Sequence, residues 1–279
     1  MVSTTPRSIL ITGCSSGIGR CAAERLRTRG YRVFATARKA EDVRQLAEAG
    51  FETCRLDLAD SASIRLAVKE VLEATGGQLY GLFNNGAYGQ PGAVEDLRRE
   101  VLREQFETNL FGTHELTNAL IPVMRRQGYG RIVQNSSVLG FAAMRFRGAY
   151  NASKFALEGL TDTLRLELAG SGVHVSLVEP GPILSRFRDN AFLKYREHID
   201  PTLSPHRATY QAMEARLRKE GPAVPFTLGP EAVVDKLTHA LEARRPRARY
   251  YVTAPTYAFG YLKRLLPTRA LDWVLGQVG

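Results

Sequence analysis

The sequence predicts an α/β protein, a doubly wound parallel sheet of about seven strands with helices on both faces. Short runs of β-branched and apolar residues alternate with longer stretches of helical periodicity. No glycine-rich or proline-rich linker divides this alternation, and 279 residues suffice for one large α/β domain. We therefore expect residues 1–279 to form a single domain.

The expected elements alternate over most of the chain. Strand-like runs lie at Ser8–Thr12, Tyr31–Thr36, Phe51–Leu56, Leu79–Asn84, Arg131–Asn135, Val173–Glu179 and Tyr250–Thr253. Helical periodicity lies at Gly19–Arg29, Ala40–Ala49, Ser61–Ala74, Val101–Gln127, Tyr150–Ala169 and Pro230–Glu242. In such a fold, ligands bind beyond the carboxyl ends of the strands.

The alternation breaks after Pro180. Residues 185–228 are polar, proline-punctuated and weakly helical, and an insertion after the sixth strand is well placed to cover a substrate. Residues 254–279 are expected to form a C-terminal helical segment that is rich in aromatic, leucine and basic residues. We favour packing of this segment on its own domain or on a sister subunit. The alternative is an amphipathic contact with a membrane or at an apolar substrate entrance.

Composition limits the class of protein. An apolar fraction of 44% with 24% charged residues is ordinary for a soluble globular protein. The formal net charge of +10 has no accompanying zinc-finger, RNA-binding or helix-turn-helix pattern, so we expect a solvated basic surface and no nucleic-acid partner. Cys14, Cys21 and Cys54 lack metal-ligand spacing and are expected to be reduced thiols, with no metal site. Residues 1–8 lack the apolar core of a signal peptide, and no apolar run could span a membrane, so a cytoplasmic location is expected.

The stretch Tyr150-Asn151-Ala152-Ser153-Lys154 is the most informative in the chain. A spacing of four residues places the phenol and the ammonium on one face of a helix. A nearby cation favours the phenolate, and we expect Lys154 to lower the pKa of Tyr150 for that reason. A tyrosine adjusted in this way can exchange a proton with an alcohol or carbonyl oxygen.

The first strand leads into a glycine-rich turn and then a helix, as in Rossmann-type dinucleotide sites. The turn reads Thr12-Gly13-Cys14-Ser15-Ser16-Gly17-Ile18-Gly19. Glycines allow the backbone to approach a pyrophosphate closely, and a helix N-terminus offers it N–H groups. The cofactor-binding residues expected here are Gly13, Ser15, Ser16, Gly17, Ile18 and Gly19.

The end of the second strand indicates which dinucleotide binds. An acidic residue there would bond the ribose 2′-hydroxyl of NAD, whereas an arginine accommodates the 2′-phosphate of NADP. The chain has Arg38 at this point and no acid before Glu41, so NADP is the expected cofactor.

Several motifs together resemble the short-chain dehydrogenases/reductases, over about Ser8 to Ser185. They occur in the family's order: the glycine turn, Asn84-Asn85, Asn109, Ser137, the Tyr150/Lys154 pair and Pro180-Gly181. The likeness is nearest to the branch of 17β-hydroxysteroid and retinol dehydrogenases and to bacterial NADP-dependent aldehyde reductases. The stretches Gly13–Gly19, Ser153–Leu160 and Gly172–Leu177 carry this closer likeness, and Phe226–Glu231 and Lys263–Pro267 look most like the bacterial aldehyde reductases.

The resemblance implies roles for four residues. Tyr150 would exchange the proton with the substrate oxygen, and Ser137 would orient and polarise the carbonyl. Lys154 would adjust Tyr150 and hold the nicotinamide ribose, and Asn109 would support a water-linked proton path to Lys154. Ser136 is the alternative serine, although strand alternation would point it to the opposite face. Each of these residues also has an ordinary structural role available, Ser136 or Ser137 as a cap and Asn109 at a helix kink.

The resemblance also implies further cofactor contacts. Asp57 would meet the adenine amino group, with Leu58 beside it, and Asn84 would stabilise the sheet near the adenosine ribose. Beyond the sixth strand the expected contacts are Pro180, Gly181, Ile183 and Ser185, where many members have threonine. The family usually reads Asn-Ala-Gly where this chain has Asn85-Gly86-Ala87, which leaves the local backbone path open.

The sequence therefore favours an NADP(H)-dependent oxidoreductase that interconverts apolar aldehydes or ketones and alcohols. The apolar preference comes from the branch resemblance and from Phe141, Ala142, Met144 and Phe146, between Ser137 and Tyr150. The rival hypotheses are an NADP(H)-binding sensor without turnover and a peripheral membrane or nucleic-acid binder. The family likeness also suggests a homodimer or homotetramer built through the helices that contain Asn109 and Tyr150.

Overall fold

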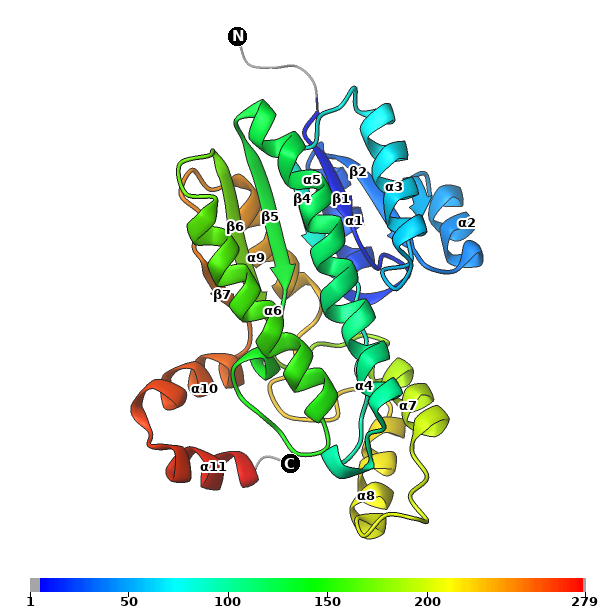
Figure 1. Ribbon diagram of the computed structural model, residues 1–279, viewed down its shortest axis with the longest axis vertical. Helices are drawn as coiled ribbons and strands as arrows, with labels where there is room; N and C mark the ends of the chain where they lie inside the picture. Colours follow the sequence, from blue (N-terminus) through cyan, green and yellow to red (C-terminus); the bar gives the residue numbers. More distant parts are fainter. Residues whose placement is uncertain (1–5, 278–279) are drawn as a thin grey trace.

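A computed structural model describes residues 6–277; the outermost residues of the predicted domain and C-terminal segment, 1–5 and 278–279, lie outside it. Seven parallel strands form one sheet in the order β3-β2-β1-β4-β5-β6-β7 (Figure 1). The strands are β1 (Ser8–Ile11), β2 (Arg32–Ala37), β3 (Glu52–Arg55), β4 (Gly81–Asn84), β5 (Gly130–Asn135), β6 (Val173–Glu179) and β7 (Arg249–Tyr251). The predicted doubly wound fold is confirmed.

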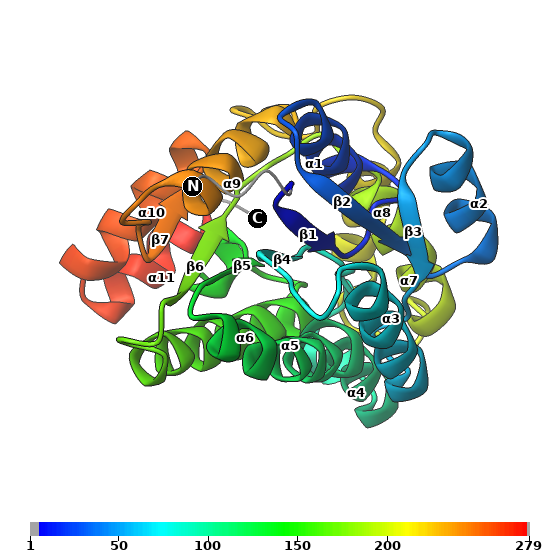
Figure 2. The same ribbon diagram turned by 90° about the horizontal axis from the view of Figure 1, so that it is seen from above.

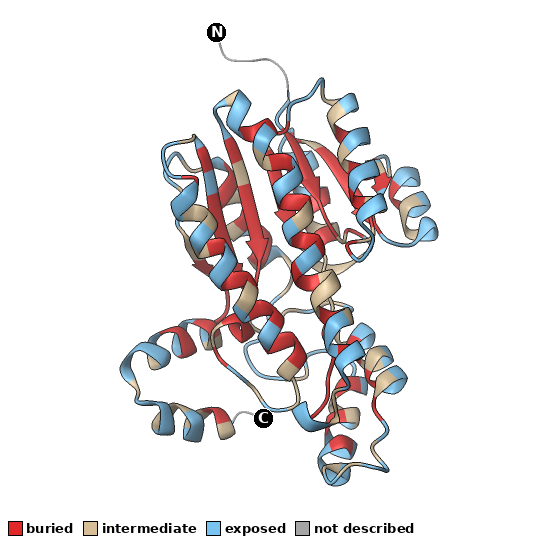
Figure 3. Ribbon diagram, in the orientation of Figure 1, coloured by how far each residue is buried: buried red, intermediate tan, exposed pale blue. Residues whose placement is uncertain are grey.

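Helices cover both faces of the sheet (Figure 2). One face carries α1 (Gly17–Thr28), α2 (Ala40–Glu48) and α9 (Glu231–Glu242). The other carries α3 (Ser61–Ala74), α5 (Thr113–Gln127) and α6 (Gly148–Glu167). Alternation along β1 sends Ile9 and Ile11 into the first core and Leu10 into the second. Strands β1, β2, β4, β5 and β6 are buried almost throughout (Figure 3) because both faces of the sheet are covered, whereas the edge strands β3 and β7 are partly exposed.

Strand order reverses at β1, which pairs with both β2 and β4. Leu10 lies opposite Phe34 on one side and Leu82 on the other. Such a switch point opens a crevice at the carboxyl ends of the strands. The long segments that follow β4, β5 and β6 gather at that same end of the molecule (Figure 1).

One predicted helix is in fact interrupted. The stretch predicted as Val101–Gln127 forms α4 (Arg99–Phe106), a π-helical turn η2 (Glu107–Gly112) and α5. Gly112 explains the irregularity, since a Cβ there would lie 1.7 Å from the carbonyl oxygen of Leu58. The helix therefore approaches the turn after β3 more closely than any side chain would allow.

The segment predicted as a weakly helical insertion contains two full helices, α7 (Phe187–His198) and α8 (Arg207–Arg218). The C-terminal segment forms α10 (Ala254–Leu265) and α11 (Thr268–Gly276), as expected. Short 3₁₀ turns, η1 (Val94–Asp96) and η3 (Val138–Gly140), complete the described elements. Within residues 6–277, none of the helices combines the length and apolarity needed to cross a bilayer.

Candidate active site

The turn after β1 forms a cradle at the N-terminus of α1. Gly17 adopts φ +57, a left-handed conformation that glycine adopts without strain. A Cβ at Gly19 would lie 2.2 Å from the carbonyl oxygen of Gly13, so only glycine fits there. The N-cap residue Ser16 makes no side-chain capping bond. The first N–H groups of α1 thus lack the usual side-chain partner and can bind an anion.

Asn85 holds this turn in place, a role that our interpretation of the sequence missed. Its Nδ2 donates to the carbonyl oxygens of Thr12 (3.0 Å) and Gly13 (3.2 Å). Thr12 Oγ1 accepts in return from the backbone N–H groups of Asn85 (2.9 Å) and Gly86 (2.7 Å). The backbone at Asn85-Gly86-Ala87, where the chain departs from the usual family order, is therefore held by hydrogen bonds to Thr12. Asn85 belongs to the Asn84-Asn85 motif, so the sequence did mark this position, but we gave the predicted role to Asn84.

Asn84, predicted beside the adenosine ribose, turns toward the other face of the sheet. Its Nδ2 donates to Thr117 Oγ1 of α5 (2.8 Å), and the side chain is buried. The structure thus gives Asn84 a contact between β4 and α5. Strand alternation explains the difference, because consecutive residues point to opposite faces.

Tyr150 and Lys154 lie buried on one face of α6, at the end of β5. Lys154 Nζ donates to the carbonyl oxygen of Asn135 (2.7 Å) and lies 5.7 Å from the centroid of the Tyr150 ring. Asn135 Nδ2 in turn donates to Asn85 Oδ1 (2.9 Å). A continuous set of hydrogen bonds therefore joins the lysine to the glycine turn.

The expected lowering of the Tyr150 pKa is wrong for this structure. Burial raises the pKa of Tyr150 to about 12, while the neighbouring Ser137 hydroxyl and the Arg147 charge act in the opposite direction. Burial also lowers the pKa of Lys154 to about 8, opposed by the charge of Glu158. Desolvation outweighs the effects of Ser137 and Arg147, so Tyr150 carries its proton at neutral pH.

Ser137, rather than Ser136, faces the tyrosine. Ser137 lies beside the Tyr150 hydroxyl, and its Oγ also accepts from the backbone N–H of Leu139 (3.1 Å) as the cap of η3. Ser136 Oγ points the other way, since it would lie 2.6 Å from a Cβ placed on Gly140. Ser137 thus caps η3 while its side chain lies beside the Tyr150 hydroxyl.

Asn109 is buried in the π-helical turn η2. Its side chain bonds both backbone groups of Tyr88, accepting from N–H (3.1 Å) and donating to C=O (2.9 Å). Its Nδ2 also reaches Ser153 Oγ (3.2 Å), next to Lys154 in the chain. The residue thus joins the loop after β4 to α6, and no direct bond to Lys154 is present among the described residues.

The residues after β6 close over the site. The carbonyl of Pro180 accepts from Val138 N–H (2.8 Å), which fixes the loop that carries Ser137. Ser185 faces the glycine turn, because a Cβ on Gly17 would lie 2.9 Å from its Cβ. Phe187, the first residue of α7, packs edge-on against Tyr150 with ring centroids 5.3 Å apart.

The other predicted contacts occupy less distinctive positions. Ile183 pairs with Leu228 in an isolated bridge and packs against the first core. A Cβ on Gly181 would lie 2.2 Å from Thr253 Oγ1, so Gly181 allows close packing on the start of α10. Asp57 accepts from Ala59 N–H (3.0 Å), in a tight turn.

Arg38 is exposed at the end of β2, and its side chain makes no ion pair within the described residues. The nearest acid in the sequence, Glu41, is engaged with Arg44. An exposed guanidinium suits a phosphate group. The glycine cradle and Arg38 together fit a phosphorylated dinucleotide.

Apolar side chains surround Tyr150. Val138, Leu139 and Ala142 form one buried cluster with the tyrosine, and the C-terminal helices contribute Phe259 and Leu275. Partly buried members complete it: Phe141, Met144, Phe187, Leu262, Leu271 and Val274. Phe146, predicted with this group, packs instead on α8.

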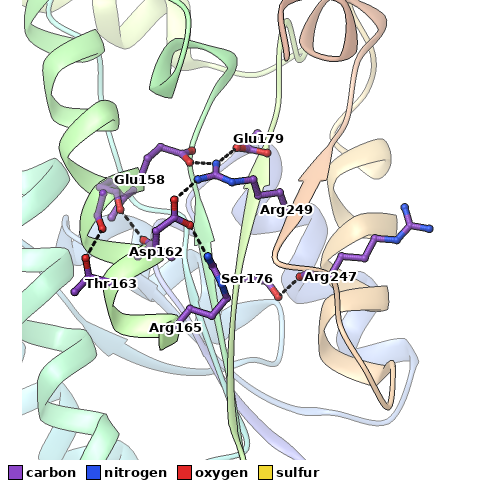
Figure 4. A network of polar contacts seen from close by, with 11 residues as sticks. Glu158, Asp162, Thr163, Arg165, Ser176, Glu179, Arg247 and Arg249 are labelled. Carbon is purple, nitrogen blue, oxygen red and sulfur yellow. Dashed lines mark hydrogen bonds and ion pairs between the residues drawn. The ribbon is translucent and has the colours of Figure 1, made fainter. Parts of the chain in front are cut away.

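A charged cluster lies further along α6 than Lys154 in the sequence, where it joins the helix to β6 and β7 (Figure 4). Arg249 of β7 bonds Glu158, Asp162 (2.6 Å) and Glu179 at once. Glu179 is fully buried at the end of β6. Burial raises the pKa of both glutamates, and Arg249 acts in the opposite direction. This cluster was not predicted from the sequence, although Glu158 and Asp162 continue the four-residue spacing of Tyr150 and Lys154.

Residues 7–196 match the family model described as short chain dehydrogenase. The chain belongs to the short-chain dehydrogenase family. It is 45% identical to the uncharacterized oxidoreductase YbbO of Escherichia coli strain K12, over 96% of this chain and 94% of that protein. It is 35% identical to 17-beta-hydroxysteroid dehydrogenase type 1 of Homo sapiens, over 88% of this chain and 77% of the human protein.

A solved short-chain dehydrogenase/reductase of Burkholderia phymatum, in complex with NAD, has a TM-score of 0.77 at 28% identity. The match covers 99% of this chain and 97% of that one. The resemblance predicted from the motifs is thereby confirmed. The protein is an oxidoreductase of this family, whose fold binds a nicotinamide cofactor.

Proposed function

We propose that the protein is an NADPH-dependent reductase of apolar aldehydes or ketones, with Tyr150 as proton donor. One observation carries this proposal. A protonated, buried tyrosine lies beside Ser137 and next to Lys154 at the strand ends. A donor of this kind suits carbonyl reduction, in which negative charge develops on the substrate oxygen.

The cofactor would lie along the switch point. The uncapped start of α1 would hold the pyrophosphate, Arg38 the 2′-phosphate and Lys154 the nicotinamide ribose. When bound, the nicotinamide supplies the hydride. Ser137 orients the carbonyl oxygen, Tyr150 protonates it, and the charge of Lys154 stabilises the tyrosine as its proton leaves. Asn109 keeps Ser153 and the following Lys154 in register.

The substrate class follows from the surroundings of Tyr150. A cluster of buried and partly buried apolar side chains includes the tyrosine and offers apolar surface to a substrate. Phe187 and the C-terminal helices close it from two sides. An apolar carbonyl compound gains most from such a lining.

Turnover of NADPH with a panel of straight-chain aldehydes and aromatic ketones tests the proposal. Tyr150→Phe keeps the ring that packs on Phe187 and removes only the hydroxyl, so kcat is expected to fall at least about 100-fold. NADPH binding by the variant, measured by fluorescence, should persist. Equal rates for both proteins would contradict the role of Tyr150. NADPH binding without turnover of any compound would favour the sensor hypothesis.

We also propose a homo-oligomer built through η2 and α6. Large apolar side chains are exposed there at Phe111, Leu160 and Leu166. Light scattering tests this, and a monomer at all concentrations would refute it. The cytoplasmic location stays a prediction.

A further inference from the structure

A cationic cavity of about 180 Å³ lies at the sheet edge, between β7, α9 and α10. Its walls combine Lys236, Arg247 and Arg264 with Tyr251, Tyr257 and Tyr261. No carboxylate is among the described residues that line it. Guanidinium, ammonium and phenol groups all donate hydrogen bonds, so this lining suits an anion with several acceptor oxygens.

The positive charge of this cavity is not neutralised by the protein. Arg249, on its inner wall, is bonded to three carboxylates. Lys236, Arg247 and Arg264, by contrast, make no ion pair within residues 6–277. Figure 4 shows the Arg247 side chain directed away from the carboxylates.

An apolar stripe continues from this cavity along α10. Tyr257, Tyr261 and Leu265 are spaced four residues apart and therefore share one face of the helix. Their exposure rises along the stripe, from 40% to 60% and 76%. On α11, Trp273 is 69% exposed, and Arg269 lies one turn before it. These side chains lack the burial that such apolar groups normally find.

The opposite face of the same two helices is anchored to the active site. Phe259 of α10 and Leu275 of α11 are buried in the cluster around Tyr150. Both helices project from the body at the carboxyl-end side of the sheet, with exposed outer surfaces (Figures 1 and 3). The apolar stripe thus lies on an arm that extends beyond the domain.

We propose that the cationic cavity and the outer face of α10 and α11 dock on an anionic phospholipid surface. Tyrosine and tryptophan side chains favour the interface between water and lipid, and leucine enters the acyl boundary. The unpaired cations complement lipid phosphates at the same edge. This docking does not depend on the proposed reductase activity, because it is measured by binding alone.

Sedimentation with vesicles tests the docking directly. The full-length protein is expected to bind vesicles of phosphatidylcholine and phosphatidylglycerol at least about tenfold more tightly than pure phosphatidylcholine, and less tightly as salt rises. Arg247→Gln/Arg264→Gln should weaken binding by about tenfold or more, since each cation near the surface matters by about 1 kcal/mol. Tyr261→Ser/Leu265→Ser should weaken it at any salt concentration. The matched controls Arg126→Gln and Leu66→Ser alter exposed residues on other helices and should bind as wild type.

Trp273 provides a second reporter, because it is the only tryptophan in the chain. Its emission is expected to shift to shorter wavelength with anionic vesicles and to be quenched by brominated lipids. Absence of vesicle binding at low salt, or equal binding by all variants, would overturn the proposal. The proposal would also be overturned if the protein bound inorganic phosphate but did not bind vesicles. A change in oligomeric mass caused by Tyr261→Ser/Leu265→Ser, without lipid binding, would instead make this face a subunit interface.

Discussion

Burial controls the chemistry of the two residues that carry the proposed reaction. Lys154 was expected to lower the pKa of Tyr150, and the four-residue spacing does place the two side chains together. Desolvation nevertheless dominates, because both groups are shielded from water. The lysine consequently loses its proton closer to neutrality than a free lysine does.

The pH dependence of the reaction follows from that change. Since the pKa of Lys154 is about 8, carbonyl reduction is expected to fall as the pH rises through that value and the ammonium is lost. Alcohol oxidation should rise with pH, because phenolate accumulates toward the pKa of Tyr150 near 12. The measurement is kcat at saturating NADPH or NADP over about pH 7 to 10.

Glu158→Gln separates this mechanism from a general effect of pH. The charge of Glu158 raises the pKa of Lys154, so its removal should move the falling limb to lower pH. Glu167→Gln, at the exposed end of the same helix, should leave the profile unchanged. A flat reduction profile in the wild type would count against the role of Lys154.

Cofactor preference is expected to depend on Arg38. Arg38→Asp removes a phosphate partner and adds a carboxylate that can accept from a ribose 2′-hydroxyl. The ratio of kcat/KM for NADPH over NADH should fall about 10-fold to 100-fold, the equivalent of one charge-assisted hydrogen bond. Arg126→Gln, at an exposed position on α5 that makes no ion pair within residues 6–277, is the matched control. An unchanged ratio in Arg38→Asp would show that NADP selection lies elsewhere.

The site residues that could be predicted from the sequence are those that belong to a local sequence pattern. The glycine turn and the Tyr150/Lys154 spacing depend on local geometry and were found where predicted. Asn85 and Arg249 were missed because their partners come from distant parts of the chain. Arg249 stands in a basic run that resembles an ordinary solvated surface.

The strands could be predicted because the alternation of apolar and polar residues and the β-branched runs are local patterns in the sequence. The π-helical turn could not be predicted, since it depends on the contact between Gly112 and Leu58 across the fold. The helices α7 and α8 were also missed. Their stability comes from packing on one another and on the loop after β4 rather than from periodicity.

A buried tyrosine of α8 holds the helix to that loop, together with the surface contact between His206 and Glu95. Tyr210 hydroxyl accepts from Ala93 N–H (2.8 Å) and donates to Asp96 (2.5 Å). Tyr210→Phe leaves a buried N–H without a partner, so opening of the α7–α8 cover should become about 5-fold to 30-fold more frequent. Limited trypsin digestion between residues 185 and 228 measures this opening.

Tyr195→Phe is the matched control for Tyr210→Phe. Tyr195 is equally buried in the same cluster, but its hydroxyl has no hydrogen-bond partner among the described residues. Its removal is expected to leave the rate of digestion unchanged. Equal rates for the two variants would show that the Tyr210 hydroxyl does not hold the cover.

Arg249 attaches the edge strand β7 to both β6 and α6. Arg249→Met leaves two buried carboxylates without a counter-ion and should lower the free energy of unfolding by about 3 kcal/mol or more. Burial holds the pKa of these glutamates high, so the loss should grow as the pH rises. Urea denaturation at several pH values measures it.

The exposed pair of Arg29 and Glu242 supplies the control for the Arg249 prediction. It joins α1 to α9 across the surface, where solvent screens the pair, so Arg29→Met should cost much less stability than Arg249→Met. Adding Glu179→Gln to Arg249→Met should restore part of the stability by removing one uncompensated charge. Equal losses in Arg249→Met and Arg29→Met would contradict a structural role for the buried cluster.

Helix α6 constrains how this chain can change in length. Tyr150, Lys154, Glu158 and Asp162 occupy every fourth position, so the proposed proton chemistry and the attachment of β7 depend on the same stretch of helix. Insertion or deletion of a single residue between Tyr150 and Asp162 would rotate the rest of the series by about 100°. Depending on its position, such a change would separate Tyr150 from Lys154 or would separate Arg249 of β7 from Glu158 and Asp162. Length variation in this helix is therefore compatible with function only outside that stretch.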